Sequence, residues 1–408
     1  MSSTTPNTTS PDRPDTSVTP APRHSWAAVL ALAAATFTVV TTEMLPVGLL
    51  TSLGAGLGVS PGTAGLAVTL PGLLAAVSAP LLPVAVRRTG RRTMLGALLL
   101  LLAAANLLCA LATDFAVLLL ARALVGVCIG GVWAVAAGLA VRLVPPASVG
   151  RATSVIFSGI AVASVLGVPA GTFLGALAGW RWSFAALSVL ALTAAGVLAR
   201  TLPPLPAERP VRLTTFGRLL RLPQVSRGLL AVALLVTGHF AAYTYVRPVL
   251  ERVPGTGAGL ISTLLLGYGV AGVAGTFAVG ALAARDPRRA LLAVSAGLGT
   301  VVALLVPADG SLAASTALLV VWGLLYGGVS VSAQNWLSAA APQAREAASG
   351  LFAGVFNTAI ALGAFTGGRV ADAAGLPQVL CLAAALALLA LPAVALAGHA
   401  EGAVTVPR

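Results

Sequence analysis

Glu43 is the one carboxylate that the sequence places deep within a long apolar run. The other ten acidic residues fall in loops, tails or the ends of such runs. Arg122 lies at a similar depth in another run, about seven residues or roughly 10 Å from its end. Burial favours the neutral form of an acid, whereas a nearby arginine favours the charged form, so such a pair can bind and release a proton. We expect Glu43 and Arg122 to form a proton site, with a static structural ion pair as the alternative.

A second group of polar side chains has the spacing of a binding surface. His239, Tyr243 and Arg247 fall at i, i+4 and i+8, which places them on one face of a helix. A lone histidine in an apolar run is more often a packed residue, but its two polar neighbours favour contact with a bound molecule. Amides in such runs also join helices to one another. Trp133, which shares the face of Arg122, is a further candidate for substrate contacts, and Gln334 and Asn357 are weaker ones.

Long apolar runs position these residues. Apolar residues make up 58% of the 408-residue chain and charged residues 9%, and the mean hydropathy is +0.97. A soluble protein carries about a quarter charged residues. Because a bilayer offers no water to backbone groups, and the runs lack the alternation of barrel strands, we predict an all-α membrane protein. The twelve predicted spans are about 26–50, 62–86, 93–112, 115–140, 152–178, 183–201, 228–250, 259–284, 290–307, 312–338, 347–370 and 377–398.

The positive charge follows the predicted topology. The formal net charge is +13, and all 24 basic residues are arginine, most of them in the short connections after even-numbered spans. Cytoplasmic loops of membrane proteins collect positive charge, so this asymmetry places both termini in the cytoplasm. The same distribution argues against nucleic acid as a partner.

The longest connection divides the chain into two halves. We predict a disordered cytoplasmic tail over 1–25, a six-helix bundle over 26–201, a cytoplasmic linker over 202–227, a second six-helix bundle over 228–398 and a cytoplasmic tail over 399–408. Apolar Phe216 and Leu219 alternate with Arg218 and Arg221 near the end of the linker, which favours a short helix on the anionic inner leaflet. A plain solvated linker is the alternative.

The two halves share an internal repeat. The repeat appears at a single offset of 197 residues, and it includes a glycine-rich span and the span after it. The matching pairs include Gly126 and Gly323, Gly130 and Gly327, Gly131 and Gly328, and Pro145 and Pro342. Two parallel six-span halves predict a binding site between them, near the middle of the membrane.

Four short motifs occur in the first half, in or next to spans one, two, four and five. They are Thr41–Gly48 in span one, the basic loop Val86–Arg92 after span two, Arg122–Trp133 in span four and Gly167-Val-Pro-Ala-Gly171 in span five. Together they resemble the major facilitator superfamily, in its twelve-span drug:proton antiporter division. The segment Gly238–Pro248 also resembles the sugar, nucleoside and chloramphenicol exporters of that division. The resemblance implies the major facilitator fold, with twelve transmembrane helices in two pseudo-symmetric six-helix bundles.

Two of these motifs imply gating residues. The resemblance assigns that role to Gly167, Pro169, Gly171, Arg88, Gly90, Arg91 and Arg92. The basic loop departs from the family pattern, because Arg87 replaces the aspartate of the motif and Ala284 stands at the same place in the second copy. We therefore expect any cytoplasmic latch to use other partners. The alternative is that these arginines only keep the loops on the cytoplasmic side of the membrane, as the positive-inside rule describes.

The resemblance implies a secondary active transporter that exports a small organic molecule in exchange for protons by alternating access. The alternatives are a symporter or facilitator that imports a metabolite, and a non-transporting receptor on the same fold. Cys109, Cys128 and Cys381 lack metal-ligand spacing, and no nucleotide loop or nucleophile with a base is evident, so we expect neither an enzyme nor a cofactor. The expected partners are a small-molecule substrate, protons and the lipid bilayer. We expect a monomer in the bacterial inner membrane.

Topology reporters test the orientation. Fusions at Arg88 or Arg285 should report the cytoplasm, and fusions near Gly257 or Asp309 should report the outside, because the arginine-rich connections stay on the cytoplasmic side. A periplasmic signal from a fusion at Arg288 would overturn the span assignment.

Overall fold

The computed structural model describes residues 24–86, 89–205, 213–308 and 310–396. Within these ranges the chain is helical, and twelve helices are long and apolar enough to cross a membrane, which confirms the predicted number of spans. The first half holds α1 (His24–Leu57), α2 (Pro61–Ala64), α3 (Leu66–Ala85), α4 (Arg91–Leu111), α5 (Phe115–Leu143), η1 (Pro146–Ser148), α6 (Val149–Val162), η2 (Ala163–Gly167), α7 (Val168–Ala178) and α8 (Trp180–Thr201). The second half holds α9 (Leu213–Leu219), α10 (Pro223–Tyr243), α11 (Val246–Leu250), α12 (Ala258–Arg285), α13 (Pro287–Leu304), α14 (Leu312–Ala340), α15 (Arg345–Ala374) and α16 (Leu376–Ala395).

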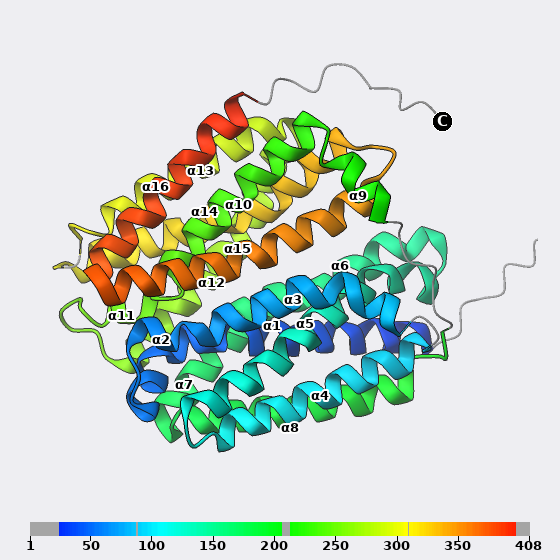
Figure 1. The fold of residues 1–408 in the computed structure, drawn as a ribbon, viewed down its shortest axis with the longest axis horizontal. Helices are drawn as coiled ribbons and strands as arrows, with labels where there is room; N and C mark the ends of the chain where they lie inside the picture. Colours follow the sequence, from blue (N-terminus) through cyan, green and yellow to red (C-terminus); the bar gives the residue numbers. More distant parts are fainter. Residues whose placement is uncertain (1–23, 87–88, 206–212, 309, 397–408) are drawn as a thin grey trace, which may run out of the picture.

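The spans form two six-helix bundles, which lie in the lower and upper parts of Figure 1. In the first bundle α3 packs on α5 and α4 on α8, and in the second α12 packs on α14 and α13 on α16. The helix pairs therefore repeat in the same order, as the sequence repeat predicts. The last part of the linker forms α9, where the Phe216 ring lies beside Gly350 of α15 and Leu219 is buried in the second bundle. Residues 206–212 lie outside the described ranges.

The internal repeat is confirmed at the level of individual contacts. A Cβ atom on Gly126 would lie 2.5 Å from the Pro71 carbonyl oxygen, and one on Gly130 would lie 2.6 Å from that of Ala75. In the second bundle Gly323 meets the backbone of Tyr268, and Gly327 meets that of Gly272, with no room for a side chain. Each residue named in the second bundle lies 197 positions after its counterpart in the first: Gly323 after Gly126, Gly327 after Gly130, Tyr268 after Pro71 and Gly272 after Ala75. The glycines let two helix backbones touch, and the same contact is built twice.

Glycines of the fifth span form the surface on which α1 packs. The span is interrupted by η2, a π-helical turn, just before Pro169, which has no N–H to donate to the Val165 carbonyl. The glycines that face α1 are Gly159, Gly167, Gly171 and Gly175, which contact its residues near Phe37, Thr41, Leu45 and Leu49. The carbonyl of Ser164 in the π turn lies against Gly269 of α12, so this span also contacts the second bundle.

Contacts between the bundles gather at the end that carries α2 and α11, on the left of Figure 1. Tyr245 has no exposed surface, and its ring and hydroxyl fit against Gly65 of the first bundle and Gly368 of the second. Its hydroxyl donates a hydrogen bond to the Ala364 carbonyl at 2.9 Å. The Asp372 carboxylate accepts hydrogen bonds from the Ser60 hydroxyl at 2.8 Å and the Gly62 N–H at 3.0 Å. Side chains of the second bundle thus close this end against the start of α2 and α3.

Replacing Asp372 with alanine should loosen this end. The variant loses two hydrogen bonds between the bundles, each worth on the order of 1 kcal/mol. Spin labels at Val59 and Gln378, in a Cys381→Ser background, should show a longer and broader distance distribution than in the parent protein. The matched control is Asp114→Ala, because Asp114 accepts the Val117 N–H at the same 3.0 Å but inside one bundle. An Asp372→Ala distribution identical to that of the control would contradict a closing role for this carboxylate.

Candidate functional site

Arg122, in α5, directs its guanidinium to backbone carbonyls of α1 and α3. The side chain has no exposed surface. Its Nε donates to the Ala67 oxygen at 2.7 Å, and its Nη1 donates to the Thr42 oxygen at 2.8 Å. Its Nη2 donates to the backbone oxygen of Glu43 at 3.1 Å. The structure therefore brings Arg122 and Glu43 together, but the hydrogen bond joins the arginine to the main chain of Glu43 and not to its carboxylate.

The second feature of the site is the buried Glu43 carboxylate. The residue is 6% exposed, and its Oε1 atom has no hydrogen-bond partner among the described residues. The carboxylate interacts electrostatically with Arg122, and the next residue, Met44, packs against the hydrophobic core of the second bundle. Leaving a buried carboxylate oxygen without a donor costs free energy in its charged form. The group is therefore suited to bind a proton, or to accept a hydrogen bond from a bound molecule.

Asn106, in α4, completes the polar surroundings of this part of α1. It is fully buried, and its Nδ2 donates to the Thr42 hydroxyl at 3.2 Å and to the Leu102 carbonyl at 3.0 Å. Its Oδ1 has no partner among the described residues. We did not predict this residue from the sequence, although an isolated asparagine in an apolar run is itself a signal, because polar groups in spans need partners.

His239 lies at the centre of an aromatic cluster in the second bundle. Its Nδ1 accepts a hydrogen bond from the Trp322 Nε1 at 3.0 Å, which identifies that nitrogen as unprotonated. The Tyr326 ring stacks on the imidazole, with centroids 3.4 Å apart and planes 7° apart. Tyr243 stacks at 5.0 Å, and the Tyr268 hydroxyl lies 3.5 Å from Nε2. Only His239 and Tyr243 of this cluster were predicted from the sequence. Tyr268 of α12 and Trp322 and Tyr326 of α14 are far away in the sequence, so helix spacing does not connect them to His239.

Arg247 is separated from His239 and Tyr243. Helix α10 ends at Tyr243 and α11 begins at Val246, because Pro248 cannot donate to the Thr244 carbonyl and so interrupts the helix. Beyond this break the Arg247 Nε pairs with Glu251 at 2.8 Å, and its Nη1 donates to the Gly48 carbonyl of α1. Thr51 donates its hydroxyl hydrogen bond to the same Glu251 carboxylate at 2.7 Å. The three residues expected on one stripe thus divide between the aromatic cluster and the closed end of the bundles.

The other candidate substrate residues make separate contacts. Trp133 stacks on Phe157 with ring centroids 5.9 Å apart. Gln334 accepts a hydrogen bond from the Ser349 hydroxyl at 3.2 Å, and Asn357 donates to the Ala353 carbonyl of its own helix at 2.9 Å. These bonds join or reinforce helices, which is the role that the sequence analysis considered as the alternative for the amides.

The basic loop binds within its own bundle. Arg92 donates to the Ala199 carbonyl at the end of α8, and the backbone N–H of Arg91 donates to the Leu205 carbonyl at 2.9 Å. Gly90, just before α4, lies against the same Leu205 carbonyl. In the second bundle Arg288, the counterpart of Arg91, donates to the Ala395 carbonyl at 2.6 Å, which also lies at the end of a sixth span. These arginines fasten the third span to the sixth in each bundle. Arg88 lies outside the described residues.

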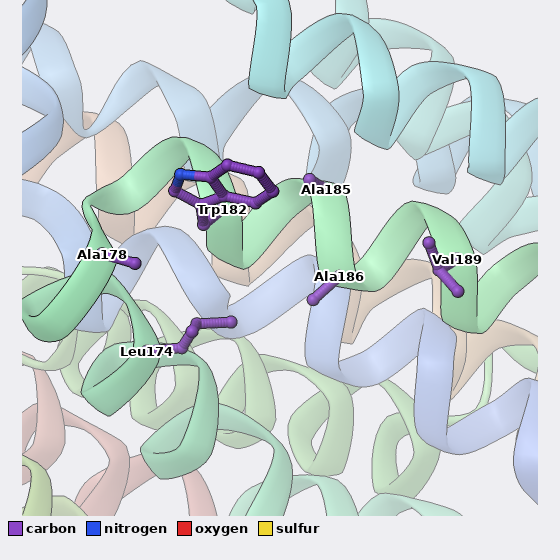
Figure 2. A pocket seen from close by; sticks show the side chains of 6 residues that line it. All are labelled: Leu174, Ala178, Trp182, Ala185, Ala186 and Val189. Carbon is purple, nitrogen blue, oxygen red and sulfur yellow. The ribbon is translucent and has the colours of Figure 1, made fainter.

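The groove drawn in Figure 2 is a different kind of site. It has a volume of about 300 Å³ and lies between α7 and α8. Its lining is entirely apolar: Leu174, Ala178, Trp182, Ala185, Ala186 and Val189. Trp182 is 63% exposed on this outer surface. The groove therefore suits lipid chains, and it includes neither the Glu43 region nor the aromatic cluster.

Comparisons with known proteins agree with this architecture. Residues 32–364 match the family model of the Major Facilitator Superfamily. The chain is 33% identical over 367 residues to the purine ribonucleoside efflux pump NepI of Escherichia coli (90% of this chain and 93% of the relative), and 35% identical over 370 residues to the transcription regulatory protein OpdE of Pseudomonas aeruginosa (90% and 92%). Among solved structures, a bacterial homologue of the human lysosomal transporter Spinster, in an inward-facing and occupied conformation, superimposes with a TM-score of 0.73. That likeness covers 90% of this chain and 96% of the other at 17% identity. With twelve spans, two repeated bundles and this match over most of its length, the chain belongs to the Major Facilitator Superfamily.

Proposed function

We propose that this protein exports a small organic molecule, of the nucleoside type, from the bacterial cell in exchange for protons. The observation that carries the proposal is the Glu43 carboxylate, which is buried at the boundary of the two bundles with an unpartnered oxygen. A proton and a substrate donor can compete for that oxygen. The relationship to a purine ribonucleoside efflux pump at 33% identity supports the direction and the substrate class.

The surroundings of Glu43 suit a proton that comes and goes. The Arg122 donors are already bound by three carbonyls, so the guanidinium stays in place whichever form Glu43 takes. Its charge favours the carboxylate, and the lack of a hydrogen bond to Oε1 favours the neutral acid. A site under these two opposing effects can release its proton when a substrate donor arrives.

The aromatic cluster is the part of the proposed site that suits a flat heteroaromatic base. Stacked aromatic pairs each contribute about 0.5–1.5 kcal/mol beyond their buried area. Tyr326 is the half-buried member of the cluster, and it stacks on His239. A flat base would therefore displace or join the Tyr326 ring.

Alternating access in this proposal uses the contacts already described. The end closed by Tyr245, Asp372 and the Arg247–Glu251 pair must open for release to the outside. The glycines that face α1, which include Gly167 and Gly171, allow this helix to pack closely on the fifth span. Rocking of the bundles would then expose the site to the two sides in turn.

A receptor without transport activity is the second candidate. It is favoured by the 35% identity to a protein described as a transcription regulatory protein. A receptor would bind its ligand in proteoliposomes without any flux, whereas an exporter would exchange labelled substrate across the membrane.

Glu43→Gln should abolish the coupling of protons to substrate. The glutamine keeps the shape and most hydrogen bonding of the acid but cannot release a proton. Proteoliposomes of the parent protein should release protons when a purine ribonucleoside such as inosine is added, and the variant should release none. Substrate counterflow, which needs no net proton movement, should survive in the variant. The conservative control is Glu43→Asp, which keeps a titratable group and should retain part of the proton release.

Proton release by Glu43→Gln at the parent level would place the coupling site elsewhere. Binding without counterflow in the parent protein would instead favour the receptor.

A further inference from the structure

Two prolines near the proposed proton site each leave a backbone carbonyl without its helical donor. Pro46 lies inside α1, and in a regular helix its N–H would bond to the carbonyl of Thr42. Pro71 lies inside α3, where the same rule leaves the carbonyl of Ala67 unpaired. A membrane interior supplies no water to such oxygens, so each needs a donor from elsewhere in the chain.

Arg122 supplies the donor to both oxygens. Its Nη1 lies 2.8 Å from the Thr42 oxygen, and its Nε lies 2.7 Å from the Ala67 oxygen. Its third bond reaches the Glu43 backbone oxygen, one residue further along α1. The planar fork of a guanidinium can serve acceptors on two helices at once, which a lysine ammonium on its flexible stem does less well.

We propose that Pro46, Pro71 and Arg122 form one positioning unit that fixes the place of α1 against α3 and α5 and, with it, the place of Glu43. The role as positioning residues rests on the proposed function of Glu43, but the physical unit does not. Arg122 acts in it chiefly as a donor to orphaned carbonyls. Its charge is a second contribution.

Neighbouring contacts hold the same segment from two sides. Gly126, one turn after Arg122, packs directly on the Pro71 backbone and so fixes the distance from α5 to α3. Asn106 of α4 holds the Thr42 side chain through its hydroxyl. The carbonyl and the side chain of Thr42 are therefore both bound by residues of neighbouring helices.

The second bundle provides an internal comparison. At the offset of 197 residues, the counterparts of Pro46, Pro71 and Arg122 are Tyr243, Tyr268 and Leu319. The two tyrosines stack on each other with centroids 4.8 Å apart, and Leu319 is a buried core residue. Both prolines and the arginine are thus absent together, as expected if the arginine is needed where the prolines remove donors.

The test is to remove Arg122 in three backgrounds. Arg122→Met is made in the parent protein, in a Pro46→Ala/Pro71→Ala protein and in a Pro392→Ala protein. Pro392 also lies inside a helix but far from the arginine in α16, so it controls for the general effect of removing a helical proline. Apparent melting temperature in detergent is measured for each, together with the rate at which a hydrophobic carbodiimide labels Glu43 at a pH that keeps it protonated. Glu43→Gln is the blank for the labelling.

Arg122→Met should lower the melting temperature by several degrees in the parent and Pro392→Ala backgrounds, and by much less in the Pro46→Ala/Pro71→Ala background. Such a difference is the signature of residues that act on one another. The labelling rate of Glu43 should change in the first two backgrounds and return toward the parent value in the third, although the positive charge is still missing. If Arg122→Met cannot be purified with the native prolines but can without them, the unit is supported in the same way.

Equal losses in all three backgrounds would overturn the proposal, and so would a labelling rate that no proline replacement restores. Neither readout requires transport. A failure of Glu43→Gln to abolish proton release would therefore contradict the proposed function while leaving this test intact.

Discussion

A backbone carbonyl in the membrane-spanning part of this chain that loses its helical donor needs another donor from within the chain, and the three backbone bonds of Arg122 are the clearest consequence. Threonines such as Thr36 and Thr38 return their hydroxyl hydrogen bonds to their own helix. The carbonyls that the two prolines leave without donors, and the buried guanidinium, would each cost free energy alone. Together they satisfy one another through hydrogen bonds. The arrangement fixes α1 against α3 and α5 and leaves the Glu43 carboxylate as a buried group with a free oxygen.

The two bundles share one backbone plan and differ in the side chains at its centre. Glycines at equivalent positions bring α3 to α5 and α12 to α14 through the same backbone contact. The first bundle then places an acid, an arginine and an asparagine near the boundary, and the second places His239 among aromatic rings. The proposed proton site thus belongs to the first bundle and the aromatic surface to the second. This division of chemistry is what the proposed exchange of a proton for a flat organic molecule needs.

The sequence predicted the number of spans, the two bundles and the repeat, because apolar runs and an ungapped offset are properties of the chain itself. It also identified Glu43, Arg122 and His239 as buried polar residues. It did not predict the partners of Arg122, since helix spacing gives the face of a side chain but not the atom that it meets on another helix. The closing contacts of Tyr245 and Asp372 depend on how the bundles meet, which no local pattern describes.

The stripe expected for His239, Tyr243 and Arg247 shows a different limit. Its spacing holds only for a continuous helix, and Pro248 ends that continuity by leaving the Thr244 carbonyl without a donor. The same rule, applied to Pro46 and Pro71, would have indicated which carbonyls needed a donor. Proline positions in an apolar run thus indicate both where a helix is interrupted and which carbonyls need a donor.

Infrared difference spectroscopy tests the central claim most directly, because it detects the carbonyl stretch of a protonated carboxylic acid. Spectra of the purified protein are recorded with and without a purine ribonucleoside, at a pH where the acid band is present, and Glu43→Gln identifies the contribution of Glu43. The account predicts that substrate removes the band of protonated Glu43 in the parent protein and that no such change occurs in the variant. A band that is absent at all accessible pH values, or that stays unchanged when substrate binds, would contradict it.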